Sequence, residues 1–388
     1  MSTLLASYAN LTLYLAMAAL ALAMIAFAVH VAFWDPAEGR RGARAGDGAA
    51  EGDTGLQGTD TRANALPDSA RVQIADLVVS GSHRPMGASA QSGEENPSQN
   101  VRTWSGLDDA GVTSATPASP DSGGPGEGEG NRGRSSGRWG MTLSWLGAFL
   151  LLGSIVMRGA SVGRAPVGNM FEFAVFGSML VMVVYLGMSL RWPLQWLGLF
   201  VVIPVLLTLG LALTVWYTEA AELLPSLKSI WLAIHVPVAT LAVAVYTIAF
   251  SVLLVQLVKA RHERRRVGGS RLGPSVGAFL DQLPSSAALD RTAYALHVVA
   301  FPLWTFSLIA GAIWAQQAWG SYWNWDPKEV WTFVIWVIYA AYLHARATSG
   351  WSIKTANILA LVGFGAIIVN FTIVNLFFIG QHSYSGLG

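Results

Sequence analysis

Eight long apolar runs constrain the fold of this chain more than any other feature. They cover residues 11–34, 139–157, 168–190, 195–217, 231–258, 296–318, 329–348 and 355–378. A helix needs about 20 apolar residues to cross the hydrocarbon core of a bilayer, and each run is near that length. Within lipid every backbone polar group must be paired inside the segment or a closed barrel. The sequence therefore predicts an all-α, polytopic integral membrane helix bundle with about eight transmembrane helices.

The composition agrees with this fold class. Hydrophobic residues make up 53% of the chain and charged residues 12%, against about 25% charged residues in soluble domains. A soluble enzyme is therefore excluded, and the net charge of +1 indicates no nucleic-acid partner. Cysteine is absent, so the chain has no disulfide, thiolate metal site or thiol nucleophile of its own. A metal here would need His, carboxylate or Met ligands.

The segment 35–138 differs from the rest of the chain. It is rich in Gly, Ser, Asp, Glu and Pro and carries too few apolar residues to form a core, which predicts a disordered linker. The one apolar stretch in it, residues 72–79, is assigned no function. The predicted organisation is thus an N-terminal transmembrane anchor (1–34), a disordered cytoplasmic linker (35–138) and a seven-span domain (139–388). Three prolines lie inside the runs, which membrane helices tolerate: Pro204, Pro237 and Pro302.

Lysine and arginine predict the orientation of the spans, because cytoplasmic loops carry an excess of both. If the N-terminus lies outside, sixteen of these residues fall on inner segments and four on outer loops, with four more in the linker. The four outer ones are Arg158, Arg164, Lys228 and Lys328. Both termini and the loop after the sixth run are therefore predicted to lie on the extracytoplasmic face of the cell membrane.

That loop, residues 319–331, reads W-G-S-Y-W-N-W-D-P-K-E-V-W and is called the Trp-rich loop below. It has four tryptophans in thirteen residues. An interfacial aromatic belt explains one or two of them. It does not explain the interleaved Gly, Asp, Pro, Lys and Glu. A flat apolar ligand with polar edges does, because indoles stack on its faces while N–H and ammonium groups meet its carboxylates.

Two histidines share the predicted outer face with this loop. His235 lies at the outer end of the fifth run, and His382 lies just beyond the eighth. A neutral imidazole is a normal axial ligand of haem iron. Either residue alone is explained as an interfacial histidine or a helix cap. Two of them beside one Trp-rich loop favour a pair of haem ligands.

His344 lies fifteen residues into the seventh run, which is about 22 Å along a helix and near the inner leaflet. Ionisable residues at such depth are costly and usually functional. The alternative is a snorkelling pair with Arg346 at the inner boundary. His297 is a comparable inner residue and a reserve candidate. The remaining histidines are interpreted as boundary or linker residues: His30, His262 and His83.

The motifs W-G-x-x-W-x-W-D-P-K-E (319–329) and Y-L-H-A-R (342–346) resemble the CcsA (ResC) family of System II cytochrome c maturation. The resemblance covers roughly residues 139–388 and includes the segments 165–172 and 224–232. Haem-handling proteins of the other bacterial pathway share the Trp-rich core, called the WWD domain, but differ after Trp-Asp. The long linker and the lack of a histidine near Arg164 depart from the family pattern.

The resemblance implies that His235 and His382 are the external axial ligands of the haem iron. It also implies that His344 is a haem ligand within the membrane, with its fellow ligand supplied by a CcsB (ResB) partner. The implied core of the external site is Trp319, Trp323, Trp325 and Asp326, with Gly320, Tyr322, Lys328 and Trp331 as further site residues. Haem b is then a bound substrate, presented at the Trp-rich loop for thioether attachment to apocytochrome c. The chain would be a subunit of a holocytochrome c synthase of the haem lyase type.

Three alternatives stay open at this point. The nearest is a haem exporter or chaperone without synthase activity. A transporter with an aromatic gate predicts acidic or polar residues along several spans, and the runs here are poor in them. A purely structural assembly subunit would tolerate replacement of His235 and His382.

Overall fold

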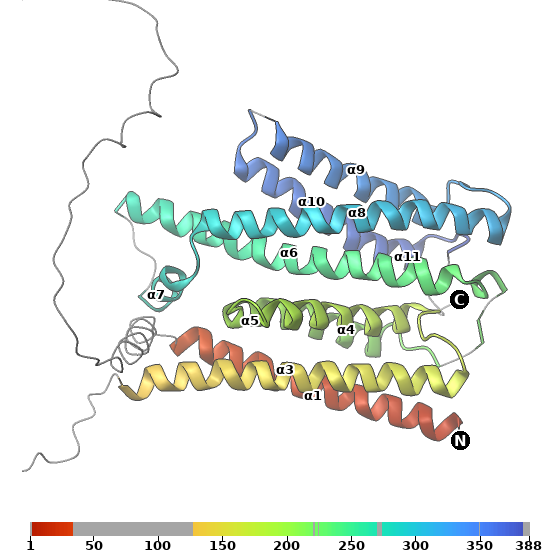
Figure 1. The fold of residues 1–388 in the computed structure, drawn as a ribbon, viewed down its shortest axis with the longest axis horizontal. Helices are drawn as coiled ribbons and strands as arrows, with labels where there is room; N and C mark the ends of the chain where they lie inside the picture. The colour runs from red at the N-terminus through yellow and green to blue at the C-terminus, as the bar shows by residue number, and fades with distance from the viewer. Residues whose placement is uncertain are drawn as a thin grey trace, which may run out of the picture. The chain divides into compact units, whose positions relative to one another are not determined.

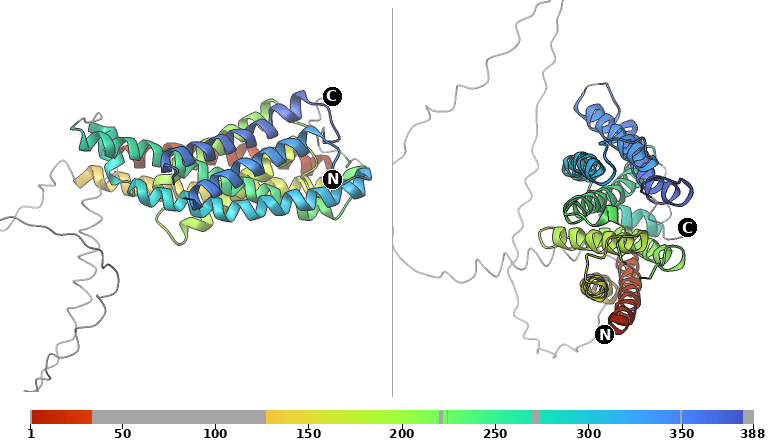
Figure 2. Two further views of the ribbon diagram at one scale, coloured as in Figure 1. Left: turned by 90° about the horizontal axis from the view of Figure 1, so that it is seen from above. Right: turned by 90° about the vertical axis from the view of Figure 1, so that its right-hand side faces the viewer.

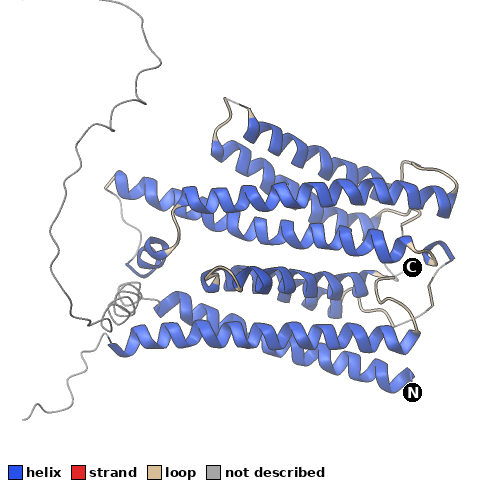
Figure 3. Cartoon of the chain, viewed as in Figure 1, coloured by secondary structure: helices blue, strands red, loops and turns tan. Residues whose placement is uncertain are grey.

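The computed structural model describes residues 2–33, 127–219, 222–223, 225–269, 274–348 and 350–382. These residues form helices and connecting loops and contain no strand (Figure 3). Eight of the helices are long and apolar enough to cross a membrane. The predicted all-α membrane bundle is therefore confirmed. Most of the expected linker, with the stretch 72–79 and His83, lies outside the described residues.

The helices lie side by side in one bundle (Figure 1). In chain order the spans are α1 (Ser2–Phe33), α3 (Glu127–Val162), α4 (Met170–Ser189), α5 (Gln195–Thr214), α6 (Trp231–Val267), α8 (Ser286–Trp319), α9 (Pro327–Ala347) and α10 (Ile353–Phe371), which α11 (Ile373–Phe377) extends. Two short helices, η1 (Pro225–Leu227) and α7 (Pro274–Gln282), lie in connections.

The packing order of the helices places α4 and α5 in the middle of the bundle. Helix α1 packs along α3 and also against α5, while α4 packs against α5 and α6. On the other side α6 packs along α8, and α9 packs along α10. The end-on view shows α4 and α5 between the α1–α3 pair and the group formed by α6, α8, α9 and α10 (Figure 2). The buried apolar core runs through all of these helices.

Several helices extend beyond the apolar runs that predicted them. Helix α3 begins at Glu127 and not at 139, within the segment assigned to the linker, and α6 continues to Val267. Helix α8 begins at Ser286, because the hydroxyl of Ser285 accepts a hydrogen bond from the N–H of Ala288 and caps it. An apolar run marks the part of a helix that lies in lipid, whereas caps and propagation set where the helix ends.

Three prolines lie inside the membrane helices, and the last span contains one break. Pro204, Pro237 and Pro302 lie inside α5, α6 and α8, as the sequence predicted. The run 355–378 is interrupted at Thr372, where α10 ends and α11 begins. The chain at the end of this span can therefore change direction before it reaches residue 382.

A buried polar cluster joins four helices at the end of the bundle opposite the Trp-rich loop. Arg346 on α9 pairs with both carboxylate oxygens of Asp290 on α8, at 2.7 and 3.2 Å. The amide of Asn357 on α10 donates to Asp290 at 2.9 Å and to Gln256 on α6 at 3.2 Å. Arg346 thus points into the protein, and a snorkelling pair with His344 is not what forms.

Candidate functional site

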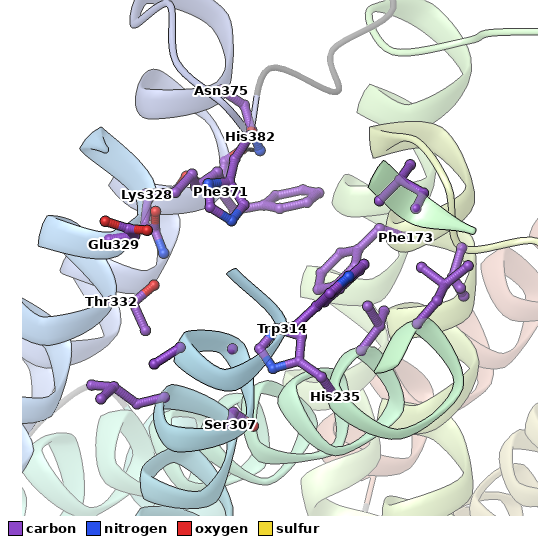
Figure 4. A pocket seen from close by; sticks show the side chains of 18 of the residues that line it. Phe173, His235, Ser307, Trp314, Lys328, Glu329, Thr332, Phe371, Asn375 and His382 are labelled. Carbon is purple, nitrogen blue, oxygen red and sulfur yellow. Dashed lines mark hydrogen bonds between the residues drawn. The ribbon is translucent and has the colours of Figure 1, made fainter. Parts of the chain in front are cut away.

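A pocket of about 240 Å³ lies at one end of the bundle. Its walls come from the starts of α4, α6 and α9 and from the ends of α8 and α10, segments that are far apart in the sequence (Figure 4). Aromatic, histidine and polar side chains line it, including His235, Trp314, Trp319, Tyr322, Trp323, Lys328, Phe371 and His382. A mostly apolar wall with a few placed polar groups is typical of a site for a small molecule.

The two histidines predicted as ligands face this pocket from different walls. Figure 4 shows His382 beside Phe371 and Lys328, and His235 beside Trp314 across the opening. His235 is the fifth residue of α6, and His382 comes from the turn that follows α11. The bundle therefore brings together two imidazoles that are 147 positions apart in the sequence.

Asp326 orients His382. The Nδ1 atom of His382 lies 2.9 Å from Oδ1 of Asp326, and the backbone N–H of Gln381 donates to Oδ2 at 2.6 Å. A carboxylate can only accept, so Nδ1 carries the hydrogen and Nε2 of the neutral ring keeps its lone pair. Metal-binding histidines are commonly held by a carboxylate in this way. The pairing thus prepares His382 to bind a metal through Nε2.

Asp326 also starts helix α9. Its side chain accepts from the N–H of Lys328 at 3.0 Å, and Glu329 in return accepts from the N–H of Asp326 at 3.2 Å. This capping box, with Pro327 at the first helical position, is the local reason why W-D-P-K-E begins a helix. Burial alone would raise the pKa of Asp326, but hydrogen bonds from His382, Lys328 and Gln381 and the nearby imidazole lower this pKa below its ordinary value.

Two glycines allow the backbone conformations around Asp326 and at the end of α8. Gly380 lies so close to Asp326 that a Cβ atom would overlap Oδ2, so only glycine lets the chain after α11 pass the carboxylate. Gly320 has a φ of 76° and its N–H donates to the carbonyl of Gln316 at 3.0 Å, which ends α8. Gly320 therefore shapes the Trp-rich loop, although it is not among the residues that line the pocket.

His235 packs against α8. Its ring meets the ring of Trp314 edge to face, with centroids 5.7 Å apart. Gly311 makes room for it, because a Cβ there would lie 3.0 Å from Cε1 of His235. The Nδ1 atom is buried and makes no hydrogen bond of ordinary geometry within the described part of the chain, although the backbone of Ser307 is near enough to interact with the ring. A buried polar atom without a well-formed bond needs an explanation, and a bound ligand is one.

Two of the loop tryptophans border the pocket. The Trp319 ring packs edge-on against His382, with centroids 4.7 Å apart. Trp323 lines the pocket with Tyr322 and meets Trp325 edge to face at 5.7 Å. These three lining residues were predicted from the sequence, and indole rings beside imidazoles suit a planar aromatic ligand.

The structure does not bring Trp325 and Trp331 to the pocket lining. Trp325 is 78% exposed. It has a φ of 56°, a conformation that costs a non-glycine residue about 1–3 kcal/mol. Trp331 packs against the core of the bundle. Trp314 takes part instead, and sequence reasoning missed it because it lies within an apolar run, where a tryptophan carries no separate signal.

Lys328 lines the pocket, but part of its bonding is internal. Its ammonium group donates to the carbonyl of Asn370 at 2.7 Å, which ties the start of α9 to the end of α10. Two ammonium hydrogens remain for other acceptors. The expectation that this group meets ligand carboxylates therefore competes with a structural role.

A buried ion cluster supports the wall of the pocket at the start of α4. Glu172 on α4 is paired with Arg158 at 3.0 Å and Arg164 at 2.8 Å, and it accepts the N–H of Gly168 at 2.8 Å. Asn169 caps α4 by accepting from the N–H of Glu172. The wall formed by residues 167–170 thus rests on a carboxylate held by two arginines that the sequence analysis treated only as loop charges.

His344 and His297 lie away from this pocket. His344 is exposed, seventeen residues beyond Pro327 on α9, or about 26 Å along the helix. His297 is buried, with Nδ1 2.7 Å from the carbonyl of Ala293 and its ring next to those of Tyr339 and Tyr342. The pocket and His344 are therefore separate places on the molecule.

The pocket coincides with a region shared by known proteins. A family described as "Cytochrome C assembly protein" matches residues 166–382. A "Cytochrome c biogenesis protein CcsA" of Synechococcus sp. (strain JA-3-3Ab) is 33% identical over 287 residues, covering 62% of this chain and 83% of the relative. The protein of the same name from Synechococcus sp. (strain CC9902) is 34% identical over 257 residues, covering 61% and 83%. That of Prochlorococcus marinus (strain NATL2A) is 36% identical over 258 residues, covering 60% and 81%.

Proposed function

Because this chain belongs to the cytochrome c assembly protein family, and so has a role in cytochrome c biogenesis, we propose that its pocket binds haem b as a substrate. The haem is presented there for thioether attachment to apocytochrome c. One observation carries the proposal: His235 and His382 face one pocket bordered by Trp314, Trp319 and Trp323. Two imidazoles from different walls are suited to bind iron on its two axial sides, while the indoles contact the porphyrin.

The chain's own residues position the haem and do not supply a nucleophile. Asp326 keeps the hydrogen of His382 on Nδ1, so Nε2 is the iron ligand. Each thioether then forms when a cysteine S–H of apocytochrome c adds across a vinyl C=C, with no leaving group. This addition mainly needs the vinyl group and the thiol to be held together in the reacting orientation. Such positioning lowers the activation barrier by about 7–11 kcal/mol at its upper limit. The histidine of the apocytochrome replaces one protein ligand as product forms.

The charge distribution supports an extracytoplasmic location for this pocket. The pocket lies at the end of the bundle where α8 ends and α9 begins. The last turn of α6, at the opposite end, holds Arg264, Arg265 and Arg266 (Figure 1). Basic residues gather on the cytoplasmic side of membrane proteins. Haem presented at the pocket is then on the same side as a secreted apocytochrome.

The position of His344 supports a second haem contact shared with a membrane partner of the CcsB (ResB) type. This imidazole is exposed on α9 within a membrane span, where an ionisable side chain facing only lipid is costly. A partner helix with one further ligand would complete an inner site. The inner site forms only in the complex with the partner. Replacement of His344 should then remove the haem of the inner site and leave haem bound at the outer site.

The test is an optical spectrum of the purified complex, because haem with two imidazole ligands has a distinctive signature. His382→Ala and His235→Ala, each combined with His344→Ala to remove the inner site, should lose this signature. Each single variant should lose holocytochrome formation, and added imidazole should restore it. His262→Gln is the matched control: it lies on α6 with His235, twenty-seven residues away, or about 40 Å along the helix. It should retain the wild-type spectrum.

Two results would contradict the proposal, in whole or in part. An unchanged spectrum in both combined variants would exclude this pocket as the haem site. A haem-loaded complex that forms no thioether product with partner and apocytochrome present would favour the exporter or chaperone instead.

A further inference from the structure

A second cavity of about 350 Å³ lies inside the membrane-spanning part of the bundle. It is enclosed mainly by α4, α5, α6 and α10, and most of its lining is apolar. Representative lining residues are Val181, Val205, Val243 and Ile367. We call it the lipid-side chamber. The haem-site residues do not account for it, because neither His235 nor His382 lines it.

Aromatic rings separate this chamber from the outer pocket. Phe173 and Phe371 line both cavities, and their ring centroids are 5.4 Å apart. Trp216 meets Phe371 edge to face at 5.1 Å from the chamber side. The two cavities are thus neighbours with a partition between them.

Three buried polar groups of the chamber lack hydrogen-bond partners among the described residues. They are the hydroxyl of Ser178, the indole N–H of Trp216 and the amide oxygen of Asn370. Their residues are only 3%, 2% and 8% exposed. Leaving buried donors unpaired is costly, so the Ser178 hydroxyl and the Trp216 N–H at one cavity point to a missing acceptor.

The chamber reaches the side of the bundle within the membrane-spanning helices. Leu207 and Leu211 on α5 and Ile368 on α10 line it and are also exposed on the outside of the bundle. All three lie within membrane spans. A ligand that enters between α5 and α10 therefore comes from the bilayer.

We propose that the lipid-side chamber binds a lipid-soluble molecule with a long apolar portion and a carbonyl-bearing head. Trp216 and Ser178 donate hydrogen bonds to the carbonyl oxygen, and the aliphatic wall covers the apolar portion. The ammonium group of Lys328, which also lines the chamber, adds a third donor at its outer end. Two molecules of the bilayer have this chemistry: a glycerolipid with its ester carbonyls and an isoprenoid quinone.

The experiment measures what the full chain retains from the membrane. The complex is purified in detergent and washed, and organic extracts are analysed by mass spectrometry for glycerolipids and quinones per protein. Trp216→Phe removes the N–H and keeps an aromatic ring. The loss of one such hydrogen bond, about 1.4 kcal/mol, should reduce retention of the ligand about tenfold.

A second variant fills the chamber. Gly177 on α4 lines it, and a Cβ there makes only an ordinary 3.4 Å contact with Thr240, so Gly177→Leu places a side chain in the cavity. Gly187→Leu is the control, because Gly187 lies on the same helix with nothing within 4 Å of its Cβ position. Gly177→Leu should lose the ligand, and Gly187→Leu should keep it.

Each outcome of these measurements either identifies the ligand or overturns the proposal. Retention of one glycerolipid or one quinone identifies the source. Equal retention of the glycerolipid or quinone in wild type, Trp216→Phe and Gly177→Leu would overturn the proposal. The readout does not depend on haem at His235 and His382, so failure here is distinguishable from failure of the proposed function.

Discussion

The imidazole of His382 and the carboxylate of Asp326 lie 2.9 Å apart although the two residues are 56 positions apart in the chain. The same carboxylate caps α9 through the N–H of Lys328 and accepts the N–H of Gln381. One buried side chain therefore joins the start of α9 to the chain after α11. The geometry of the proposed iron ligand is thus coupled to the fold of the Trp-rich loop.

Replacing this carboxylate by an amide separates its two roles. Asparagine caps a helix about as well as aspartate, but it offers one acceptor oxygen where the carboxylate offers two, so Asp326→Asn should lower the thermal midpoint at neutral pH. Loss of the charged acceptor should weaken haem binding about 10- to 100-fold, the usual effect of removing a group that orients a metal ligand. A haem titration followed optically measures this. Unchanged affinity would show that Asp326 acts only as a cap.

The acidity of Asp326 predicts a pH effect on stability. Its pKa in the folded protein is below the ordinary value, so its contribution is present above the unfolded pKa of about 3.9 and is lost as the pH falls through the folded pKa. Acid should therefore destabilise the wild type more than Asp326→Asn below about pH 4. Thermal midpoints measured from neutral to acidic pH test this. Parallel curves for the two proteins would contradict it.

Gly311 should act as a positioning residue for His235. A methyl group there would lie 3.0 Å from Cε1 of the imidazole and push it from its place beside Trp314. Alanine in a helix is about 1 kcal/mol more favourable than glycine, so Gly311→Ala should lose haem affinity without losing stability. Gly153→Ala is the control on α3, because its Cβ position meets nothing within 4 Å. Similar haem affinity in both variants would refute the positioning role.

The ion cluster on Glu172 should be a main support of the pocket wall. Removing the charge of a buried carboxylate held by two arginines typically costs about 3–5 kcal/mol, so Glu172→Gln should lower the thermal midpoint and loosen haem. The pair of Glu222 and Lys228, at 3.8 Å, is exposed, and such pairs contribute about 0–1 kcal/mol. Glu222→Gln is therefore the matched control. A stability loss of equal size in both would contradict this assignment.

Local features of the sequence determined the fold class and the order of the spans. The length of an apolar run decides whether a helix can cross a bilayer, and this property is readable without knowing any neighbour. Two further features can be read from nearby residues alone. They are the prolines within membrane helices (Pro204, Pro237 and Pro302) and the helix start at Asp326-Pro327. The type of residue also singled out His235 and His382, because their chemistry is carried by the side chain itself.

Only the tertiary structure decided which side chains meet. Trp314 borders the pocket while Trp325 and Trp331 do not, because helix rotation and crossing set which face of α8 and α9 turns toward α6. The pairing of Arg346 with Asp290 is likewise a contact between helices. Apolar runs that are hydrophobic on every side carry no periodic mark of their buried face. The packing of whole helices, with ion pairs such as that of Glu172, supplies the information that the sequence pattern lacks.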